Sequence, residues 1–477
     1  MDWLSLQSRM PKDADMPVRC SKLLALEAIL EGRQYDQLIY PFSKERSEAG
    51  EYIPLDERRP SVRTGLCRVV VEDSVSLLFS EGHWPTIQAS DPHTLLALND
   101  LVAECRLKET MLEAATRGSV GSVAIHMRIV KSRPFLAVMG TKFLTPAWRL
   151  DDPRQLLSVS ECYKVDAATL IALGFDVDPD AGMFWFKRVW DDQAELWFKP
   201  VPIDDGYAAM AVDPDRSIVH GLGFVPIVWI RNISGGSGHE PDGVDGMCTF
   251  AAAIDTVIEV DYLLSQAGRG LKYGSDPTLV LKDPSASIGG ATPSRVGGVA
   301  SALTLPPEGD AKLLEINGNA AAAVLAHVKE LRAIALEAMH GNRAHGDRAG
   351  TAPSGRAIEM MCQGLIWLAD RLRISYGDGG LLALLSMLCR ASSRLRDGLI
   401  VAGIAYRDLD PRGLALAWPS WFPASFSDRQ AQASSVATLI AAGVIDRPQA
   451  YAIVAPLYGL TEATAIDTDG EDATLIA

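Results

Sequence analysis

The chain has 477 residues, of which 48% are hydrophobic, so it is long enough for two or more domains with substantial cores and is not a disordered protein. Its 60 acidic and 45 basic residues give a formal net charge of −15. A surface of this sign repels nucleic acid as a whole, which argues against a conventional DNA-binding domain.

Cysteine spacing and apolar runs exclude several further classes. The seven cysteines are scattered singly, with no Cys-x-x-Cys pair, which predicts neither a disulfide framework nor a zinc site. The first residues lack the basic and apolar regions of a signal peptide. No apolar run approaches the ~18 to 20 residues of a membrane span. We therefore expect reduced thiols and no membrane partner.

The first 246 residues have the pattern of an α+β region. A helical pattern covers 23–30, and another runs from Pro92 to Arg117. From Ser122 to Val130 apolar and other residues alternate, which predicts a half-buried strand. Turn signals separate five further strand candidates, at 135–139, 161–165, 184–189, 195–199 and 224–230.

Two long helical patterns follow a glycine-rich linker at 235–243. Between them, 273–316 holds short strand candidates at 278–281, 302–305 and 312–315. A module of this size is poorly stable alone, so we expect it to pack against copies of itself. Apolar residues at three- and four-residue steps place one stripe on each helix, Val257, Val260, Leu264, Ala267 and Leu271 on the first and Val324, Val328, Leu331, Ala335 and Ala338 on the second.

A polar loop and a third helical pattern come next. Residues 340–352 contain three glycines and no bulky apolar side chain, so they cannot form a core and are expected to be an exposed loop. The third pattern opens at Pro353 and meets Gly377-Asp-Gly-Gly380 in mid-course. Each glycine costs a helix about 1 kcal/mol relative to alanine, which predicts a kink or break there.

This order of elements, with Pro-Ser-Gly-Arg-Ala-Ile-Glu at 353–359 after the polar loop, resembles the portal proteins of tailed bacteriophages. The resemblance covers most of the chain and consists of element order and short motifs. It implies an α+β fold with a wing (1–246), a first stem helix (247–272), a small β-containing clip (273–316) and a second stem helix (317–340). A tunnel loop (341–353), a long kinked helix returning to the wing (354–425) and a helical crown with the C-terminal tail (426–477) would complete it.

The resemblance also implies a function. Portal subunits form a ring of about twelve copies at one capsid vertex, the channel for packaging and ejection of double-stranded DNA. Such a ring is the docking platform for the terminase large subunit and for head-tail adaptor proteins, beside major capsid and scaffolding proteins. We therefore expect a non-enzymatic virion protein without cofactor or metal, assembled in the host cytoplasm, whose acidic channel lets DNA slide without sequence specificity.

Two groups of polar residues are the candidate sites. In the tunnel loop, basic and amide side chains would touch phosphates without reading bases; the alternative is an exposed loop with an ordinary charge mixture. On the second stem helix, charged residues either line the channel or pair between neighbouring subunits. The loop candidates are Asn342, Arg343, His345 and Arg348, and the stem candidates are Lys329, Glu330, Arg332 and Glu337.

Catalytic motifs do not occur in the sequence. It contains no P-loop, no His-Glu-x-x-His and no Gly-x-Ser-x-Gly, and His340 and His345 have no third metal ligand nearby. Two other hypotheses stay open. A phage scaffold or adaptor without a channel predicts a different oligomer or none. An α+β enzyme with its site near the glycine-rich linker predicts a monomer with a saturable pocket.

Overall fold

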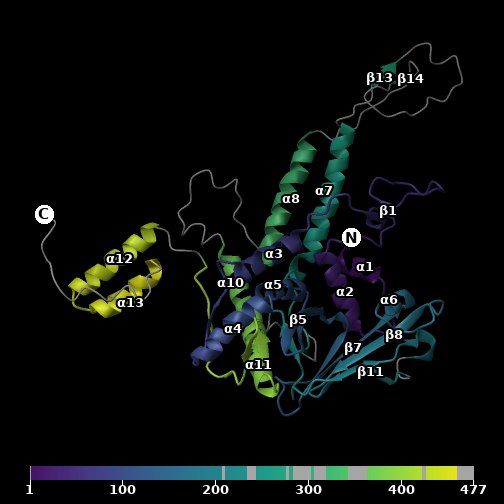
Figure 1. The fold of residues 1–477 in the computed structure, drawn as a ribbon. Coiled ribbons are helices and arrows are strands. Elements are labelled where there is room, and N and C mark those ends of the chain that lie inside the picture. The colour runs from purple at the N-terminus through teal and green to yellow at the C-terminus, as the bar shows by residue number, and fades with distance from the viewer. Residues whose placement is uncertain are drawn as a thin grey trace. The chain divides into compact units, whose positions relative to one another are not determined.

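The computed structural model describes residues 2–206, 210–233, 243–274, 279–282, 302–305, 318–341, 362–421 and 426–458. The chain contains both helices and sheets and has a mixed α+β fold, as the sequence predicts (Figure 1). It divides into two compact units. The larger comprises Met1–Ala344 and Cys362–Pro419, and the smaller His345–Met361 and Ser420–Ala477.

Helices form the first part of the larger unit. The helical pattern from Pro92 to Arg117 is confirmed, but it forms two helices, because Arg106 adopts a left-handed φ of 50° and divides it. Asp91 caps the first of these helices by accepting a hydrogen bond from the backbone N–H of Thr94 at 2.9 Å. The helices are α1 (Trp3–Ser8), α2 (Val18–Leu30), α3 (Leu66–Phe79), α4 (Pro92–Glu104) and α5 (Leu107–Gly118).

A three-stranded antiparallel sheet joins two cores of this unit. Its strand order is β12 (Ile227–Arg231), β4 (Ser122–Val130) and β5 (Arg133–Gly140). β4 has the predicted bounds, but its first six residues are buried on both faces instead of one. Ile125 packs into the main core, whereas Ala124 on the opposite face packs into a second core. The two-sided burial arises because a second sheet covers the face that the alternation assigned to solvent.

The second sheet has six strands and supplies that cover. Its order is β11–β9–β8–β7–β6, with β10 also paired to β8. The candidates at 161–165, 184–189 and 195–199 are confirmed as parts of β7, β8 and β9, whereas β6, β10 and β11 were not predicted. The strands and the short helices beside them are β6 (Leu144–Trp148), β7 (Leu156–Asp166), β8 (Met183–Trp190), β9 (Ala194–Phe198), β10 (Val201–Pro202), β11 (Val212–Val219), α6 (Ala167–Ala172), η2 (Thr141–Phe143) and η3 (Ile203–Asp205).

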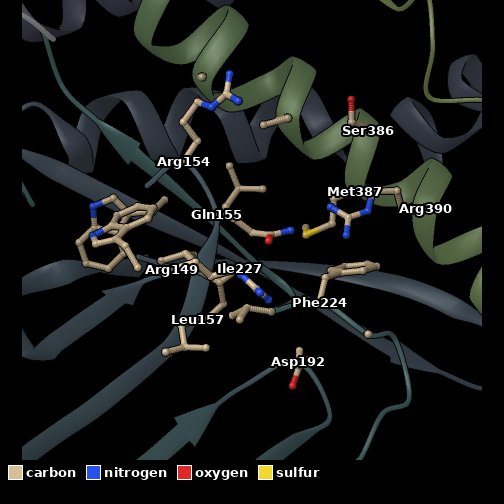
Figure 2. A pocket seen from close by; sticks show the side chains of 18 residues that line it. Arg149, Arg154, Gln155, Leu157, Asp192, Phe224, Ile227, Ser386, Met387 and Arg390 are labelled. Atoms are coloured by element: carbon tan, nitrogen blue, oxygen red, sulfur yellow. The ribbon is translucent and has the colours of Figure 1, made fainter. Parts of the chain in front are cut away.

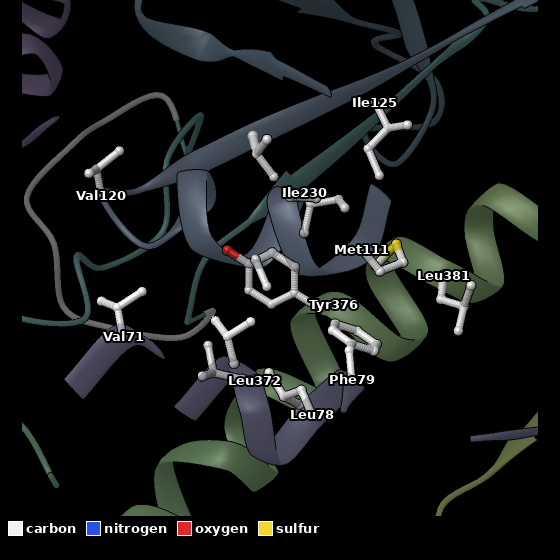
Figure 3. Close-up of a cluster of buried hydrophobic side chains, with 14 of the residues drawn as sticks. Val71, Leu78, Phe79, Met111, Val120, Ile125, Ile230, Leu372, Tyr376 and Leu381 are labelled. Carbon is white, nitrogen blue, oxygen red and sulfur yellow. The ribbon is translucent and has the colours of Figure 1, made fainter. Parts of the chain in front are cut away.

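A long helix crosses the main core, and its glycines do not break it. α10 (Gln363–Leu372) continues as a π-helical segment, η7 (Arg373–Leu382), into α11 (Ala383–Arg394). Of the predicted kink or break at Gly377–Gly380, the break is therefore wrong, whereas the helix does change there from α-helical to π-helical geometry. A Cβ on Gly377 would lie 2.6 Å from the Trp418 ring, and one on Gly380 would lie 2.8 Å from Ile230. Figure 3 shows Tyr376 of η7 within this core. Tertiary packing at these two glycines offsets the low helix propensity.

Two helices of equal length lie side by side in a two-helix projection, which we call the stem. α7 (Ile254–Gly274) and α8 (Gly318–Ala338) have 21 residues each and lie side by side (Figure 1). Between them in sequence, β13 (Leu279–Lys282) and β14 (Ala302–Leu305) form a parallel pair. Two of the three strand candidates in this segment are thereby confirmed, and the third, at 312–315, lies outside the described residues.

Short strand pairs complete the larger unit, and two helices form the described part of the smaller one. α12 ends shortly before Gly443, whose φ is 70°. None of the described helices combines the length and apolarity needed to cross a membrane. The remaining elements are β1 (Tyr40–Pro41) with β2 (Arg58–Arg59), β3 (Thr86–Gln88) with β17 (Ala415–Ala417), β15 (Leu399–Val401) with β16 (Ile404–Tyr406), η1 (Leu55–Glu57), η5 (Ala251–Ala253), α12 (Phe426–Ala441) and α13 (Arg447–Tyr458).

Candidate functional site

The predicted sites fall on two parts of the chain. The tunnel-loop candidates Asn342, Arg343, His345 and Arg348 lie outside the described residues. The stem candidates lie on α8, and all four of their side chains are exposed. The stem is therefore the predicted site whose geometry is open to description.

The four stem candidates do not share one face of α8. Residues three, four and seven apart lie on the same side of a helix. Glu330 and Glu337 therefore lie together, and Lys329 and Arg332 lie together on a different side. If α8 lines a channel, either the acidic pair or the basic pair faces the lumen, because no single side of the helix carries all four charges.

The acidic pair belongs to a surface that we call the outer face of α8, which consists of His327, Glu330, Ile334 and Glu337. All four side chains are exposed, and the face carries no lysine or arginine. It lies opposite the buried stripe of the helix. Ile334 has an exposed fraction of 54%, so an apolar side chain stands between the two carboxylates without cover in the single chain. The buried residues of α8 are Val328, Ala335 and Leu336.

A buried carboxylate anchors the base of the stem. Asp261 of α7 is fully buried and accepts hydrogen bonds from the backbone N–H and the hydroxyl of Thr64, both at 2.8 Å, and from the Tyr35 hydroxyl at 3.0 Å. Burial raises the pKa of Asp261, while these three donors oppose the rise. Ser265, one turn further along α7, accepts a hydrogen bond from the backbone N–H of Val62 at 3.0 Å. These bonds hold the N-terminal segment against α7.

A basic groove lies where that segment meets α7. This surface, the stem groove, has a volume of about 700 Å³ and lies between residues 41–43 and 59–63 on one side and α7 on the other. Among the described residues, four cations and no acidic side chain line it. They are Arg59, Arg63, Arg269 and Lys272. In a chain with a net charge of −15, four cations around one groove form a local reversal of sign.

A second pocket, of about 330 Å³, lies between α11, the β6–β7 turn and β12 (Figure 2). Arg149 and Arg154 at its edge pair with Asp151 and Asp152 at 3.0 and 3.4 Å. The Arg390 guanidinium lies 4.5 Å from the centre of the Phe224 ring, and burial lowers the pKa of Arg390. The described residues that line this pocket include no histidine, cysteine or glutamate, so they provide no nucleophile paired with a base.

An ionic cluster lies inside the six-stranded sheet. Nε of Arg188 donates to Glu161 at 2.7 Å, while its guanidinium lies 4.8 Å from the centre of the Trp190 ring and 3.9 Å from Glu195. Burial raises the pKa of Glu161, against the opposing charge of Arg188. Beside the cluster, burial lowers the pKa of His126 to about 4. These groups bind one another closely, so the cluster joins strands and leaves little capacity for an external ligand.

The acid next to the glycine-rich linker has a structural role. Asp245 accepts from Nε and Nη2 of Arg19 at 2.6 and 2.7 Å, a bidentate pair that ties the chain after the linker to α2. An enzymatic site built on this carboxylate would first have to break that pair.

Sequence reasoning did not find the stem groove or the Arg188 cluster. Both combine residues far apart in the chain, and no local spacing signals either. A partial signal for the groove was the arginine cluster at Arg58-Arg59 and Arg63 in a strongly acidic chain. Within the described ranges, no group of three or more histidine, cysteine, aspartate or glutamate side chains is placed to hold a metal ion.

No protein-family model matches the chain, and no curated protein matches it.

Proposed function

We propose that this chain is the subunit of a portal ring, the channel through which a tailed bacteriophage packages and ejects its double-stranded DNA. The observation that carries the proposal is the pair of 21-residue stem helices, connected through a segment that holds a strand pair. At 1.5 Å per residue each helix is about 31 Å long. A two-helix projection of that length, rooted by Asp261 in an α+β body, agrees with the stem and wing of the family.

Exposed apolar side chains on the stem also support an assembly. Leu271 on α7 has an exposed fraction of 50%, and on α8 Leu325 and Ile334 have 42% and 54%. The two sides of a two-helix projection can each pack against another copy of the chain, and exposed apolar side chains on the helices favour such contacts.

The chemistry of the chain suits a channel that moves DNA without gripping it. With −15 charges per subunit, a ring presents a high density of negative charge to a duplex. Duplex DNA, with one phosphate charge per ~1.7 Å, is repelled and slides with little adhesion. The tunnel loop with Arg343 and Arg348 would touch phosphates at the narrowest point. The terminase large subunit and then head-tail adaptors would dock on the clip, with major capsid and scaffolding proteins around the wing, in the virion.

Native mass spectrometry with negative-stain imaging tests the proposal. A portal predicts a ring with a central hole and a mass near 617 kDa (12 × 51.4 kDa), or that of an adjacent subunit number. A compact monomer at high concentration would contradict the ring, and a closed oligomer without a hole would favour a scaffold or adaptor. Within a ring that assembles normally, Arg343→Ala with Arg348→Ala should impair DNA packaging or retention, and normal packaging would contradict the role of the loop.

A further inference from the structure

We infer that the stem groove of one chain receives the outer face of α8 of a second copy, so that opposite charges determine how neighbouring stems pack. The inference rests on the ring proposed above and adds the surface, its partner and the residues that recognise it.

The groove provides cations that the chain itself only partly compensates. Arg269 pairs with Glu45, and Arg63 lies 3.4 Å from Asp36. Arg59 is partly buried and has no carboxylate partner among the described residues. A partly desolvated guanidinium gains free energy from an added carboxylate, because the attraction between opposite charges grows as water is excluded.

The outer face of α8 provides the matching chemistry. Glu330 and Glu337 stand two turns apart, and Ile334 lies between them. The groove also has an apolar surface for Ile334, since Val62 has an exposed fraction of 37% and lies beside Pro60 and Phe42. The two surfaces therefore complement each other in both charge and polarity.

The two surfaces lie on opposite flanks of one stem. α7 lies between α8 and the β1 segment that forms the far wall of the groove, as Figure 1 shows. A contact between different surfaces on opposite flanks is head-to-tail, and repeating such a contact generates a closed ring or an open chain. A symmetric dimer would instead need one surface that recognises itself, and two basic grooves repel each other.

An acidic protein surface fits the groove better than a nucleic acid does. Binding duplex DNA by counterion release needs clustered cations free of competing carboxylates. Here Glu45 and Asp36 already pair with two of the four cations, so the groove offers too few charges to follow a backbone that carries a phosphate at every nucleotide. A second copy brings only two carboxylates and an apolar residue, which the groove matches.

A charge swap tests the inference by native mass spectrometry. One variant reverses the groove (Arg59→Glu with Lys272→Glu), one reverses the outer face (Glu330→Lys with Glu337→Lys), and the third carries all four changes. Each single-surface variant should raise the concentration needed for assembly by roughly tenfold or more, because it opposes like charges. The variant with all four substitutions should restore assembly, which a misfolded chain could not do. The control is Lys131→Glu with Arg133→Glu, the same charge change on the exposed β4–β5 turn.

The outcomes separate this inference from the portal proposal. If the wild type forms rings and the groove and outer-face variants form them equally well, the docking is wrong and the portal proposal stands. If the chain forms open chains or other oligomers that follow the charge swap, the docking holds and the portal proposal fails. If the groove variant keeps its rings but loses affinity for a fluorescent DNA duplex, the groove binds nucleic acid and the inference is overturned. A wild type that never self-associates refutes both.

Discussion

Asn232 is expected to be among the most sensitive single polar residues of the larger unit. It is fully buried, and its Nδ2 donates to Met247 O at 2.6 Å, to Thr249 Oγ1 at 2.9 Å and to Ser119 O at 3.3 Å. Its Oδ1 accepts from the hydroxyl of the fully buried Tyr376 at 3.0 Å. One amide thus joins the end of β12, the chain before α7 and the π-helical segment.

The cost of Asn232→Ala follows from counting the groups it leaves without a partner. Ser119 O keeps a second donor, the backbone N–H of Thr249 at 2.9 Å. Among the described residues, Met247 O, the Thr249 hydroxyl and the Tyr376 hydroxyl keep no partner. At about 1–3 kcal/mol for each unsatisfied buried group, the loss in free energy of unfolding is about 3–9 kcal/mol. Tyr376→Phe leaves only the Asn232 amide oxygen without a hydrogen-bond donor and should lower the free energy of unfolding by about 1–3 kcal/mol.

Urea unfolding followed by tryptophan fluorescence measures these losses. The midpoints should be compared at two protein concentrations, because assembly adds stability by mass action. Asn99→Ala, an exposed position on α4, is the control and should change stability by less than about 0.5 kcal/mol. The role of these buried hydrogen bonds is refuted if Asn232→Ala lowers the free energy of unfolding no more than Asn99→Ala does, or if Tyr376→Phe lowers it more than Asn232→Ala does.

Three further predictions concern packing and charge in the same unit. Gly377→Ala should lower the free energy of unfolding, measured by thermal denaturation, by about 1–3 kcal/mol, because the new Cβ would collide with the Trp418 ring. Gly379→Ala is the control and should be neutral or slightly stabilising, because the nearest atom to its Cβ is 3.7 Å away. Equal losses in the two variants would contradict this prediction. His126 has its pKa lowered from 6.5 to about 4, so the unfolded chain binds a proton that the folded chain refuses. Stability is therefore fully present above pH 6.5 and falls by about 3 kcal/mol toward pH 4, and His126→Gln should flatten this slope in unfolding curves taken across that range. Arg188→Met should lower the free energy of unfolding by about 3–5 kcal/mol at pH 7, because it leaves Glu161 and Glu195 without their cation. The loss should be smaller in acid, because burial raises the pKa of Glu161 and a protonated carboxyl no longer needs the cation; a loss independent of pH in denaturant titrations would argue against the ion pair.

The stem illustrates how far local periodicity reaches. The apolar stripe of α7 at Val257 and Val260 is buried as the spacing predicts, because one side of a helix repeats every three or four residues whatever it packs against. Leu271, in the same stripe, has an exposed fraction of 50%. Spacing assigns residues to a face, and only the presence of a neighbour decides whether that face is covered. Near the end of α7 the described part of a single chain leaves Leu271 half exposed.

The strands illustrate the opposite limit. β6 and β11 were not predicted because Pro146 and Pro214 interrupt their sequence patterns. Pairing with β7 and β9 makes them strands all the same, and β11 accommodates Pro214 within a register irregularity between Asp213 and Ile218. The glycines of η7 follow the same rule, since close contacts from distant residues outweigh their low helix propensity.

The sequence by itself determined the mixed α+β class, the bounds of β4 and the presence of two long helices after the glycine-rich linker, because each depends on residues within a few positions of one another. The start of the first of these helices, expected at 247, lies at Ile254. Only the tertiary structure decided that β4 is buried on both sides and that Arg59 meets α7 across a groove. These features depend on contacts between residues as far apart as Val62 and Ser265. Such contacts carry no signal in local spacing, since the chain brings them together only when its apolar surfaces find cover from water.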